Sequence, residues 1–250
     1  ISGSFQPEPA RGAEWNRGAY LVQGPAHCSA CHAPRNALGA HRDMLSLAGG
    51  LIPEQNWYAP SLHSPREAGV QDWPLQDIVA LFRDGRAPQG QVTGPMAEVV
   101  QHSTQHWRED DLRAMATYLQ ALPRGDAAAG TPTPTAPASD HALGREIYAQ
   151  HCASCHGEQG EGVPKAYPPL AGNRAVLMRS PANPIQVILS GGFPPATAGN
   201  PRPFGMPPYQ LVLKDAEIAA VLSYVRSSWG NQAGAVTELD VLALRGGSLR

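Results

Sequence analysis

The sequence contains few charged residues and few aromatic ones, at 16% and 6% of its 250 positions. Its formal net charge is only −2, and the lack of a strongly basic face argues against a nucleic-acid partner. No apolar run approaches the length of a membrane-spanning helix. The first residues also lack the charged start and apolar run of a signal peptide, so we expect a mature or truncated form.

Cysteine is equally scarce, and all four copies fall into two Cys-x-x-Cys-His patterns, so no thiol is left for another role. The patterns consist of Cys28, Cys31 and His32, and of Cys152, Cys155 and His156. At this spacing two thiols can form thioethers with the two vinyl groups of one haem, and the adjacent histidine can become the proximal ligand of the iron. The sequence therefore predicts two covalently bound haem c groups, each with its iron.

Three other uses of the cysteines fit less well. A zinc site made from both Cys-x-x-Cys pairs requires one small module, but about 120 residues separate the pairs. A thioredoxin-like redox pair needs no following histidine and is expected in a βαβ pattern, which this sequence does not show. A structural disulfide within Cys-x-x-Cys would have a strained geometry. Haem attachment therefore explains the two motifs best.

The chain has the pattern of an internal repeat with a break in the middle. Residues 124–141 are rich in Pro, Ala and Thr and lack apolar periodicity, which is typical of a semi-extended linker. Each flanking segment has a helical pattern before the haem motif, a Pro-x-Leu after it and a short apolar helix that ends at a glycine. We expect an extension at 1–13, domains at 14–123 and 142–232, and a C-terminal tail at 233–250.

The last predicted helix of each half carries the clearest amphipathic pattern. The apolar faces are formed by Leu112, Met115, Ala116, Leu119 and Leu122, and by Ile218, Val221, Leu222, Val225 and Trp229. Tyr118 and Tyr224 hold equivalent places on these helices. The order of helix, haem motif, loops and helix resembles class I cytochrome c, and it occurs twice. This resemblance predicts an all-α fold of two tandem domains, each with a few helices and long loops around a covalent haem.

Each iron needs a second axial ligand, and two methionines are the best candidates. Met96 and Met206 lie in Pro/Gly-rich segments just ahead of the last helix of their half, where class I cytochromes present the distal methionine. A thioether stabilises Fe(II) relative to Fe(III), so this ligation raises the reduction potential. Two filled axial positions leave no place for a substrate, which predicts outer-sphere one-electron transfer without a catalytic residue.

The other candidate ligands fit less well. His102 is a rival at the first site, because it lies only six residues beyond Met96. No histidine follows His156, so a second histidine ligand there would have to come from the other domain. The three other methionines fall in a predicted helix core, close to the first haem motif or ahead of a short helix: Met115, Met44 and Met178.

Several residues near the motifs are candidates for fixing the haems. Pro60 and Pro168 can orient the proximal imidazoles if their carbonyl groups accept a hydrogen bond from the second ring nitrogen. Trp57, Tyr58 and Arg35 are candidates for contacts with a haem edge or a propionate, although ordinary packing explains them equally well.

Longer strings resemble the cytochrome c subunits of membrane-associated periplasmic dehydrogenases. These strings cover nearly the whole chain and lie at residues 14–22, 28–40, 57–60, 94–100, 167–173 and 223–231. The resemblance implies that Met96 and Met206 are iron ligands. Those subunits usually carry three haem domains, whereas this chain shows two. Residues 5–10 look like the family's linker between its first and second domains.

The resemblance implies an electron-transfer subunit rather than an enzyme. Its electron donor would be a periplasmic dehydrogenase of the flavin, molybdenum or quinoprotein type, and its acceptor a quinone, a cytochrome or an oxidase. The expected location is the bacterial periplasm, with peripheral association at the outer face of the inner membrane. Two alternatives stay open: a dihaem enzyme of the peroxidase or thiosulfate dehydrogenase type, and a freely diffusing dihaem carrier.

Overall fold

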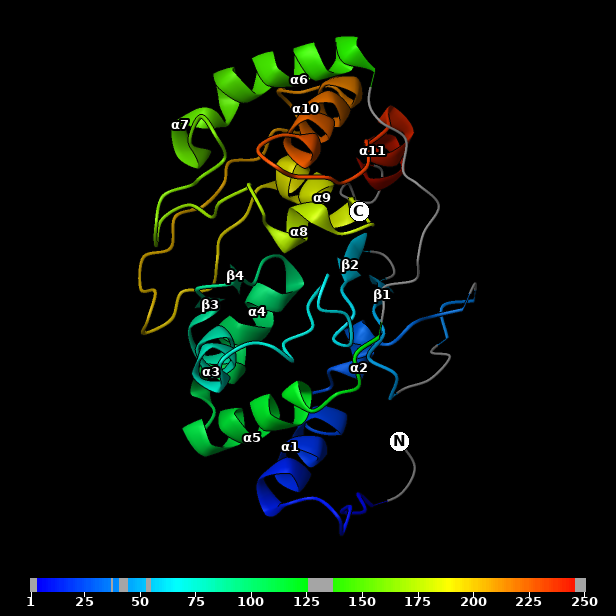
Figure 1. The fold of residues 1–250 in the computed structure, drawn as a ribbon, viewed down its shortest axis with the longest axis vertical. Helices are drawn as coiled ribbons and strands as arrows, with labels where there is room; N and C mark the ends of the chain where they lie inside the picture. Colours follow the sequence, from blue (N-terminus) through cyan, green and yellow to red (C-terminus); the bar gives the residue numbers. More distant parts are fainter. Residues whose placement is uncertain (1–3, 37, 41–44, 53–54, 126–136, 246–250) are drawn as a thin grey trace. The chain divides into compact units, whose positions relative to one another are not determined.

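The computed structural model describes all residues except 1–3, 37, 41–44, 53–54, 126–136 and 246–250. Helices predominate in the described residues, and the strands there form two short two-stranded sheets (Figure 1). The mainly helical architecture expected from the sequence is confirmed, and the short strands are additional to it. None of the helices in this part of the chain is long and apolar enough to cross a membrane.

The contacts of the chain divide it into two compact units. Unit 1 comprises Ile1–Pro53, Tyr58–Ala127 and Pro195–Pro201. Unit 2 comprises Glu54–Trp57, Ala128–Pro194 and Arg202–Arg250. Each unit therefore contains one of the two Cys-x-x-Cys-His motifs.

The elements from the N-terminus onward are mostly short. The first half of the chain forms α1 (Ala13–Gln23), α2 (Ser29–His32), β1 (Gly50–Ile52), β2 (Trp57–Ala59), α3 (Leu75–Asp84), β3 (Arg86–Ala87), β4 (Gly90–Gln91), α4 (Pro95–His102), the 3-10 helix η1 (Thr104–His106) and α5 (Glu109–Gln120). The second half forms α6 (Ala138–His151), α7 (Ala153–His156), α8 (Arg174–Leu177), α9 (Ala182–Ser190), α10 (Asp215–Ser227) and α11 (Glu238–Arg245).

The first and last long helices of each repeat cross at a glycine. In unit 1, α1 packs across α5 with Gly18 against the backbone of Ala114. In unit 2, α6 packs across α10 with Gly144 against the backbone of Ala220 (Figure 1). A Cβ atom at these two glycines would lie 1.9 and 2.2 Å from the carbonyl oxygen of the partner helix. Only glycine therefore permits so close an approach of the two backbones.

Equivalent tyrosines flank the two crossings, as the repeat predicts. Tyr118 packs against Trp15 with ring centroids 5.2 Å apart. Tyr224 packs against Tyr148 and Trp229 with ring centroids 5.6 and 5.4 Å apart. In both units the tyrosine Cβ lies 2.8 Å from the point where a Cβ atom on the crossing glycine would be. The two crossings are thus built in the same way.

The amphipathic faces predicted for the last helices form the centre of each hydrophobic core. The buried members on α5 and α10 are Leu112, Met115, Ala116 and Leu119, and Ile218, Val221, Leu222 and Val225. Leu122 and Trp229 follow the helix ends and are partly buried against the same cores. The predicted glycine ends are also confirmed, because Gly85 after α3 and Gly191 after α9 have φ angles of +75° and +63°.

Two elements begin where the sequence predicts irregular chain. Helix α6 starts at Ala138, inside the segment 124–141 expected as a linker, and residues 126–136 of that segment lie outside the described residues. Helix α11 lies within the expected tail 233–250 and buries Val241 completely in the core of unit 2. Val241 and Leu244 of α11 thus pack against a surface that the local sequence pattern does not reveal.

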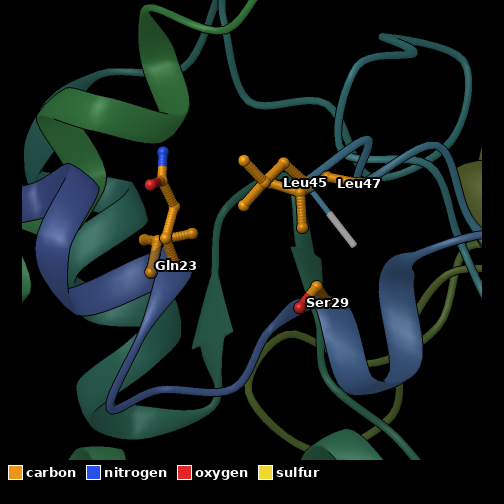
Figure 2. A pocket seen from close by; sticks show the side chains of 5 residues that line it. Gln23, Ser29, Leu45 and Leu47 are labelled. Atoms are coloured by element: carbon orange, nitrogen blue, oxygen red, sulfur yellow. The ribbon is translucent and has the colours of Figure 1, made fainter. Parts of the chain in front are cut away.

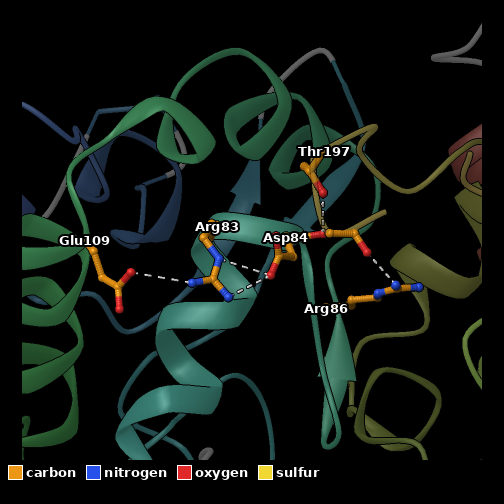
Figure 3. A network of polar contacts seen from close by, with 6 residues as sticks. Arg83, Asp84, Arg86, Glu109 and Thr197 are labelled. Atoms are coloured by element: carbon orange, nitrogen blue, oxygen red, sulfur yellow. Dashed lines mark hydrogen bonds and ion pairs between the residues drawn. The ribbon is translucent and has the colours of Figure 1, made fainter. Parts of the chain in front are cut away.

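The segment Pro195–Pro201 packs within unit 1, whereas the chain on both sides of it belongs to unit 2. The Arg86 guanidinium donates a hydrogen bond to the Gly199 carbonyl at 2.6 Å, and the Thr197 hydroxyl donates to the Asp84 carbonyl at 3.3 Å (Figure 3). The Asp84 carboxylate is paired with Arg83 of the same helix. A division of the chain into two consecutive domains would place this segment in the second one. The segment packs in unit 1 because its hydrogen-bond partners there are polar groups far away in sequence.

Candidate haem-binding sites

Both Cys-x-x-Cys-His motifs fold into single helical turns. Helix α2 carries Cys31 and His32, and α7 carries the equivalent pair in unit 2. All four cysteines are partly buried, and none of them is joined in a disulfide. Burial raises the pKa of Cys28 to about 12 and that of Cys152 to about 11, so both are uncharged at neutral pH. Redox-active Cys-x-x-Cys pairs have a lowered pKa instead, and the thioredoxin-like interpretation therefore fits poorly.

The proximal histidines are oriented as expected from the sequence. The Nδ1 of His32 lies 2.7 Å from the Pro60 carbonyl oxygen, and the Nδ1 of His156 lies 3.1 Å from that of Pro168. A carbonyl only accepts, so Nδ1–H is the donor in both rings and Nε2 is left as the metal-binding atom. Burial lowers the pKa of both histidines, an effect that the carbonyl partly offsets. Each ring is thus held as a neutral imidazole in the tautomer that a proximal haem ligand requires.

A glycine supports each proximal loop, and sequence reasoning missed both. The amide of Gly49 donates to the His32 carbonyl at 2.7 Å, and that of Gly162 donates to the His156 carbonyl at 2.8 Å. Their φ angles are +83° and +68°. A Cβ at Gly49 would lie 2.7 Å from the Ser61 amide nitrogen, and one at Gly162 would lie 2.6 Å from the Tyr167 carbonyl oxygen. The two glycines follow their histidines at different distances along the chain, which hides the equivalence in the sequence.

The two proximal loops differ in the side chain that holds them. In unit 1 the buried Glu67 carboxylate accepts hydrogen bonds from the Ser61 amide at 2.6 Å and the Tyr58 hydroxyl at 3.0 Å. The Tyr58 hydroxyl is thus a contact of the proximal loop, and its contact with a haem edge stays a prediction.

In unit 2 the buried side chain of Asn231 holds the proximal loop. It accepts from the Gly172 amide at 2.8 Å and donates to the carbonyls of Leu170 and Val225 at 3.1 and 2.7 Å. In unit 1 the Gln71 amide likewise donates to the Leu62 carbonyl at 3.0 Å, so the carboxylate of Glu67 is an additional contact of that loop.

The two predicted distal ligands lie in different local settings. Met96 is the second residue of α4 rather than part of an irregular loop, and it is partly buried against the hydrophobic clusters of unit 1. Met206 is partly buried and lies in an extended segment, where its backbone pairs with Gly192 through N···O contacts of 2.8 and 3.0 Å. The structure thus gives each methionine a fixed backbone while leaving its ligation a prediction.

The rival ligands have different surroundings. His102 lies exposed at the C-terminal end of α4. Met115 and Met178 are only 1% and 7% exposed, so their thioethers are enclosed by other side chains. Met44 lies outside the described residues. No three His, Cys, Asp or Glu side chains gather into a metal site within the described ranges.

Two further features lie beside the first motif, and the second fits a haem. A small hollow at Ser29 is lined by Leu45 and Leu47 and, from α1, by Val22 and Gln23 (Figure 2). The Arg35 side chain donates to the carbonyls of Gly39 and Ala30 at 2.9 and 2.7 Å, but its buried Nε–H has no partner. A buried orphan donor is costly unless an acceptor such as a carboxylate reaches it, so Arg35 fits a haem propionate.

Comparison with known proteins agrees with this geometry. Residues 141–229 match the sequence profile of the family described as Cytochrome c. The cytochrome c subunit of a quinone-type alcohol dehydrogenase from Gluconobacter oxydans is 40% identical, over 92% of this chain and 51% of that protein. The gluconate 2-dehydrogenase cytochrome c subunit of Pantoea cypripedii is 34% identical, over 97% of this chain and 58% of that protein. The chain thus spans about half the length of these relatives.

A shorter relative is matched over most of its own length. Cytochrome c-552 of Thermus thermophilus is 38% identical, over 35% of this chain and 69% of that protein. Paired thiols followed by a carbonyl-oriented neutral histidine define a c-type haem protein. The chain belongs to the cytochrome c family, whose covalent haem serves electron transfer.

Proposed function

We propose that this chain is a dihaem cytochrome that relays single electrons. The observation that carries the proposal is the repeated proximal arrangement, in which each motif histidine donates to a proline carbonyl and is followed by a supporting glycine. Both motifs are therefore built for the same cofactor. Covalent haem supplies a reversible one-electron couple at its iron.

The residues of each unit divide this task between them. In unit 1, Cys28 and Cys31 would hold the haem through thioethers, His32 would ligate the iron from the proximal side and Met96 from the distal side. The corresponding residues of unit 2 are Cys152, Cys155, His156 and Met206. With both axial positions filled, no residue acts as a catalytic group, and the protein contributes position and electrostatic tuning.

The relatives suggest the partners. Several of them are named as cytochrome subunits of alcohol, gluconate and fructose dehydrogenases. We propose that this chain accepts electrons from a periplasmic dehydrogenase of the flavin, molybdenum or quinoprotein type. It would pass them to a quinone or a downstream cytochrome or oxidase at the outer face of the inner membrane. Native extracts separated by size exclusion should show co-elution with a dehydrogenase subunit, and elution as a free chain would contradict a stable complex.

Haem content is the direct test of the dihaem proposal. The purified full chain should contain two haems that stay attached under denaturing conditions. The double variant Cys152→Ala/Cys155→Ala should retain one. A single haem in the unaltered chain would contradict the proposal. Turnover with peroxide or thiosulfate alone would favour the dihaem-enzyme alternative instead.

The distal ligands are tested by single substitutions. Met96→Ala and Met206→Ala should each lower the midpoint potential of one haem and remove its sulfur-to-iron charge-transfer band, because a thioether favours Fe(II). Met115→Leu in unit 1 and Met178→Leu in unit 2 are matched controls, since both residues lie enclosed in the fold. These two should leave the band and the potentials in place. An unchanged band after either alanine substitution would refute that ligand assignment.

A further inference from the structure

Two charged side chains are buried among the described residues, one in each unit and with opposite signs. Glu67 of unit 1 is 7% exposed, and Arg226 of unit 2 is 2% exposed. Charged side chains are rarely buried unless they are paired, because removing them from water is costly. Neither residue forms an ion pair within the described ranges. Their charges therefore act on the interior of their own units.

The Glu67 carboxylate is surrounded by hydrogen-bond donors. Its oxygens accept from a backbone N–H at Ser61 and from the Tyr58 hydroxyl, and both donors stabilise a negative charge. Burial and the neighbouring Glu67 charge raise the pKa of Tyr58, so this hydroxyl stays a neutral donor. Ser61 directly follows Pro60, whose carbonyl accepts from His32. The N–H bound to the carboxylate and the carbonyl that orients the proximal histidine therefore belong to the same peptide group.

The surroundings of Arg226 suit a retained positive charge. Its guanidinium donates to the carbonyls of Val176, Met178 and Gly234 at 2.5, 3.0 and 2.7 Å. Burial lowers its pKa to about 10, with a partial offset from Asp240, so it remains protonated at neutral pH. The adjacent Val225 carbonyl accepts from Asn231, the amide that fixes the proximal loop of unit 2. Unit 2 thus combines a buried cation with a neutral loop contact.

We infer that these buried charges split the two haems in potential, with the haem of unit 1 the lower and the haem of unit 2 the higher. The inference rests on the proposed pair of haems and adds the order of their potentials. Oxidation of a haem iron adds one positive charge to its site. The Glu67 carboxylate stabilises that oxidised state in unit 1, and the Arg226 guanidinium destabilises it in unit 2. An electron shared by the pair therefore resides mainly on unit 2.

The expected size of the effect follows from Coulomb's law. A unit charge about 12 Å from a redox centre changes the reduction equilibrium by roughly tenfold at an effective dielectric constant of about 20. Tenfold corresponds to about 59 mV for a one-electron couple. Glu67→Gln keeps a side chain of similar shape with an acceptor oxygen and removes the charge. It should shift the reduction equilibrium of the lower-potential haem by about tenfold, which raises its midpoint potential by about 59 mV. The upper midpoint potential should stay unchanged.

Two control variants separate charge from position. Tyr58→Phe removes a hydrogen bond from Glu67 but keeps the carboxylate, so it should not raise the lower potential. Glu109→Gln removes a charge whose side chain is 75% exposed on α5, where solvent screens it, and should change neither potential appreciably. In unit 2, Arg226→Gln should lower the upper potential, whereas Arg226→Lys keeps the charge and should not. These are read by spectroelectrochemical titration of the full chain.

The order of the potentials has its own test, which does not depend on how the Glu67 variant folds. A full chain with Cys152→Ala/Cys155→Ala carries haem only in unit 1, and one with Cys28→Ala/Cys31→Ala only in unit 2. The former should have the lower midpoint potential, and an equal or higher value would overturn the inference. So would an unchanged lower potential in a Glu67→Gln chain that carries both haems, or an equal rise in Tyr58→Phe. A haem count of one in the unaltered chain would instead refute the dihaem proposal.

Discussion

Substitution of Gly18 by alanine tests whether the crossing of α1 and α5 holds unit 1 together. In an exposed helix this change normally stabilises a protein by about 0.5–1 kcal/mol, because alanine loses less backbone entropy on folding. At the crossing the new Cβ would lie 1.9 Å from the Ala114 carbonyl oxygen and 2.6 Å from its carbonyl carbon. The nearest of these contacts is roughly 1.5 Å shorter than ordinary van der Waals contact. Because the obstructing atoms belong to a helix backbone, the helices must move apart.

The cost of moving them exceeds the gain in helix propensity. Forcing extra atoms into a well-packed core typically costs about 1–3 kcal/mol, and here separation of the helices also loosens Leu112 and Met115, which are 0% and 1% exposed. We expect Gly18→Ala to lower the free energy of unfolding of unit 1 by about 2 kcal/mol or more. Denaturant unfolding followed by far-UV circular dichroism and by the Soret band measures it.

Gly12→Ala is the matched control for this substitution. Gly12 precedes α1 with a φ of −67°, and no atom lies within 4 Å of its Cβ position. Its replacement should change stability by less than about 1 kcal/mol, the usual range for the residue before a helix. Retained or increased stability in Gly18→Ala would show that the helices do not cross as closely as described, and would refute the reasoning.

Two further predictions concern the α11 helix and one ion pair. Val241→Ala should lower the free energy of unfolding by about 1–3 kcal/mol, because Val241 is fully buried. Leu239→Ala on the same helix should be nearly neutral, because Leu239 is 74% exposed. Equal effects of the two substitutions would contradict the packing of α11. The Arg17 guanidinium bonds Asp111 at 2.7 and 3.0 Å and holds the pKa of that carboxyl below its ordinary value. The pair therefore stabilises above the ordinary carboxyl pKa and is lost as pH falls through the lowered one. Asp111→Asn should cost at most about 1 kcal/mol at neutral pH, since half of the Arg17 side chain is exposed. This cost should vanish in strong acid when stability is measured against pH, and a cost independent of pH would contradict the assignment.

The sequence predicted the parts of this protein that depend on local pattern. The helices α5 and α10, the glycines that end α3 and α9, and the proline carbonyls behind both histidines all follow from periodicity and spacing. Apolar spacing at 3.6 residues per turn identifies a buried helix face wherever the partner surface lies. The proline carbonyls were predictable because a metal-bound histidine commonly donates its second ring N–H to such a group.

The parts that escaped prediction depend on contacts between distant residues. Gly49 packs against the loop of Ser61, and Pro195–Pro201 contributes its hydrogen bonds to unit 1, so neither role has a local pattern. Glu67 lies in a polar stretch that resembles a solvated loop, yet its carboxylate is buried by the fold. Long-range polar contacts carry no periodicity, because a single side chain can form them from any local structure.

The comparison of the two units shows which features the haem requires and which are free to vary. Both units keep the crossing glycine, the histidine that donates to a proline carbonyl, and a glycine with positive φ behind it. These features fix where the motif histidine lies, and two sites proposed for the same cofactor would need to share them. The side chains that bond the proximal loop differ between the units, because a carboxylate, Glu67, takes part in unit 1 and the amide of Asn231 in unit 2. A duplicated chain can therefore change the charge beside one haem while keeping the geometry of both. In the proposed dihaem chain, two sites with the same proposed ligands would in this way differ in potential.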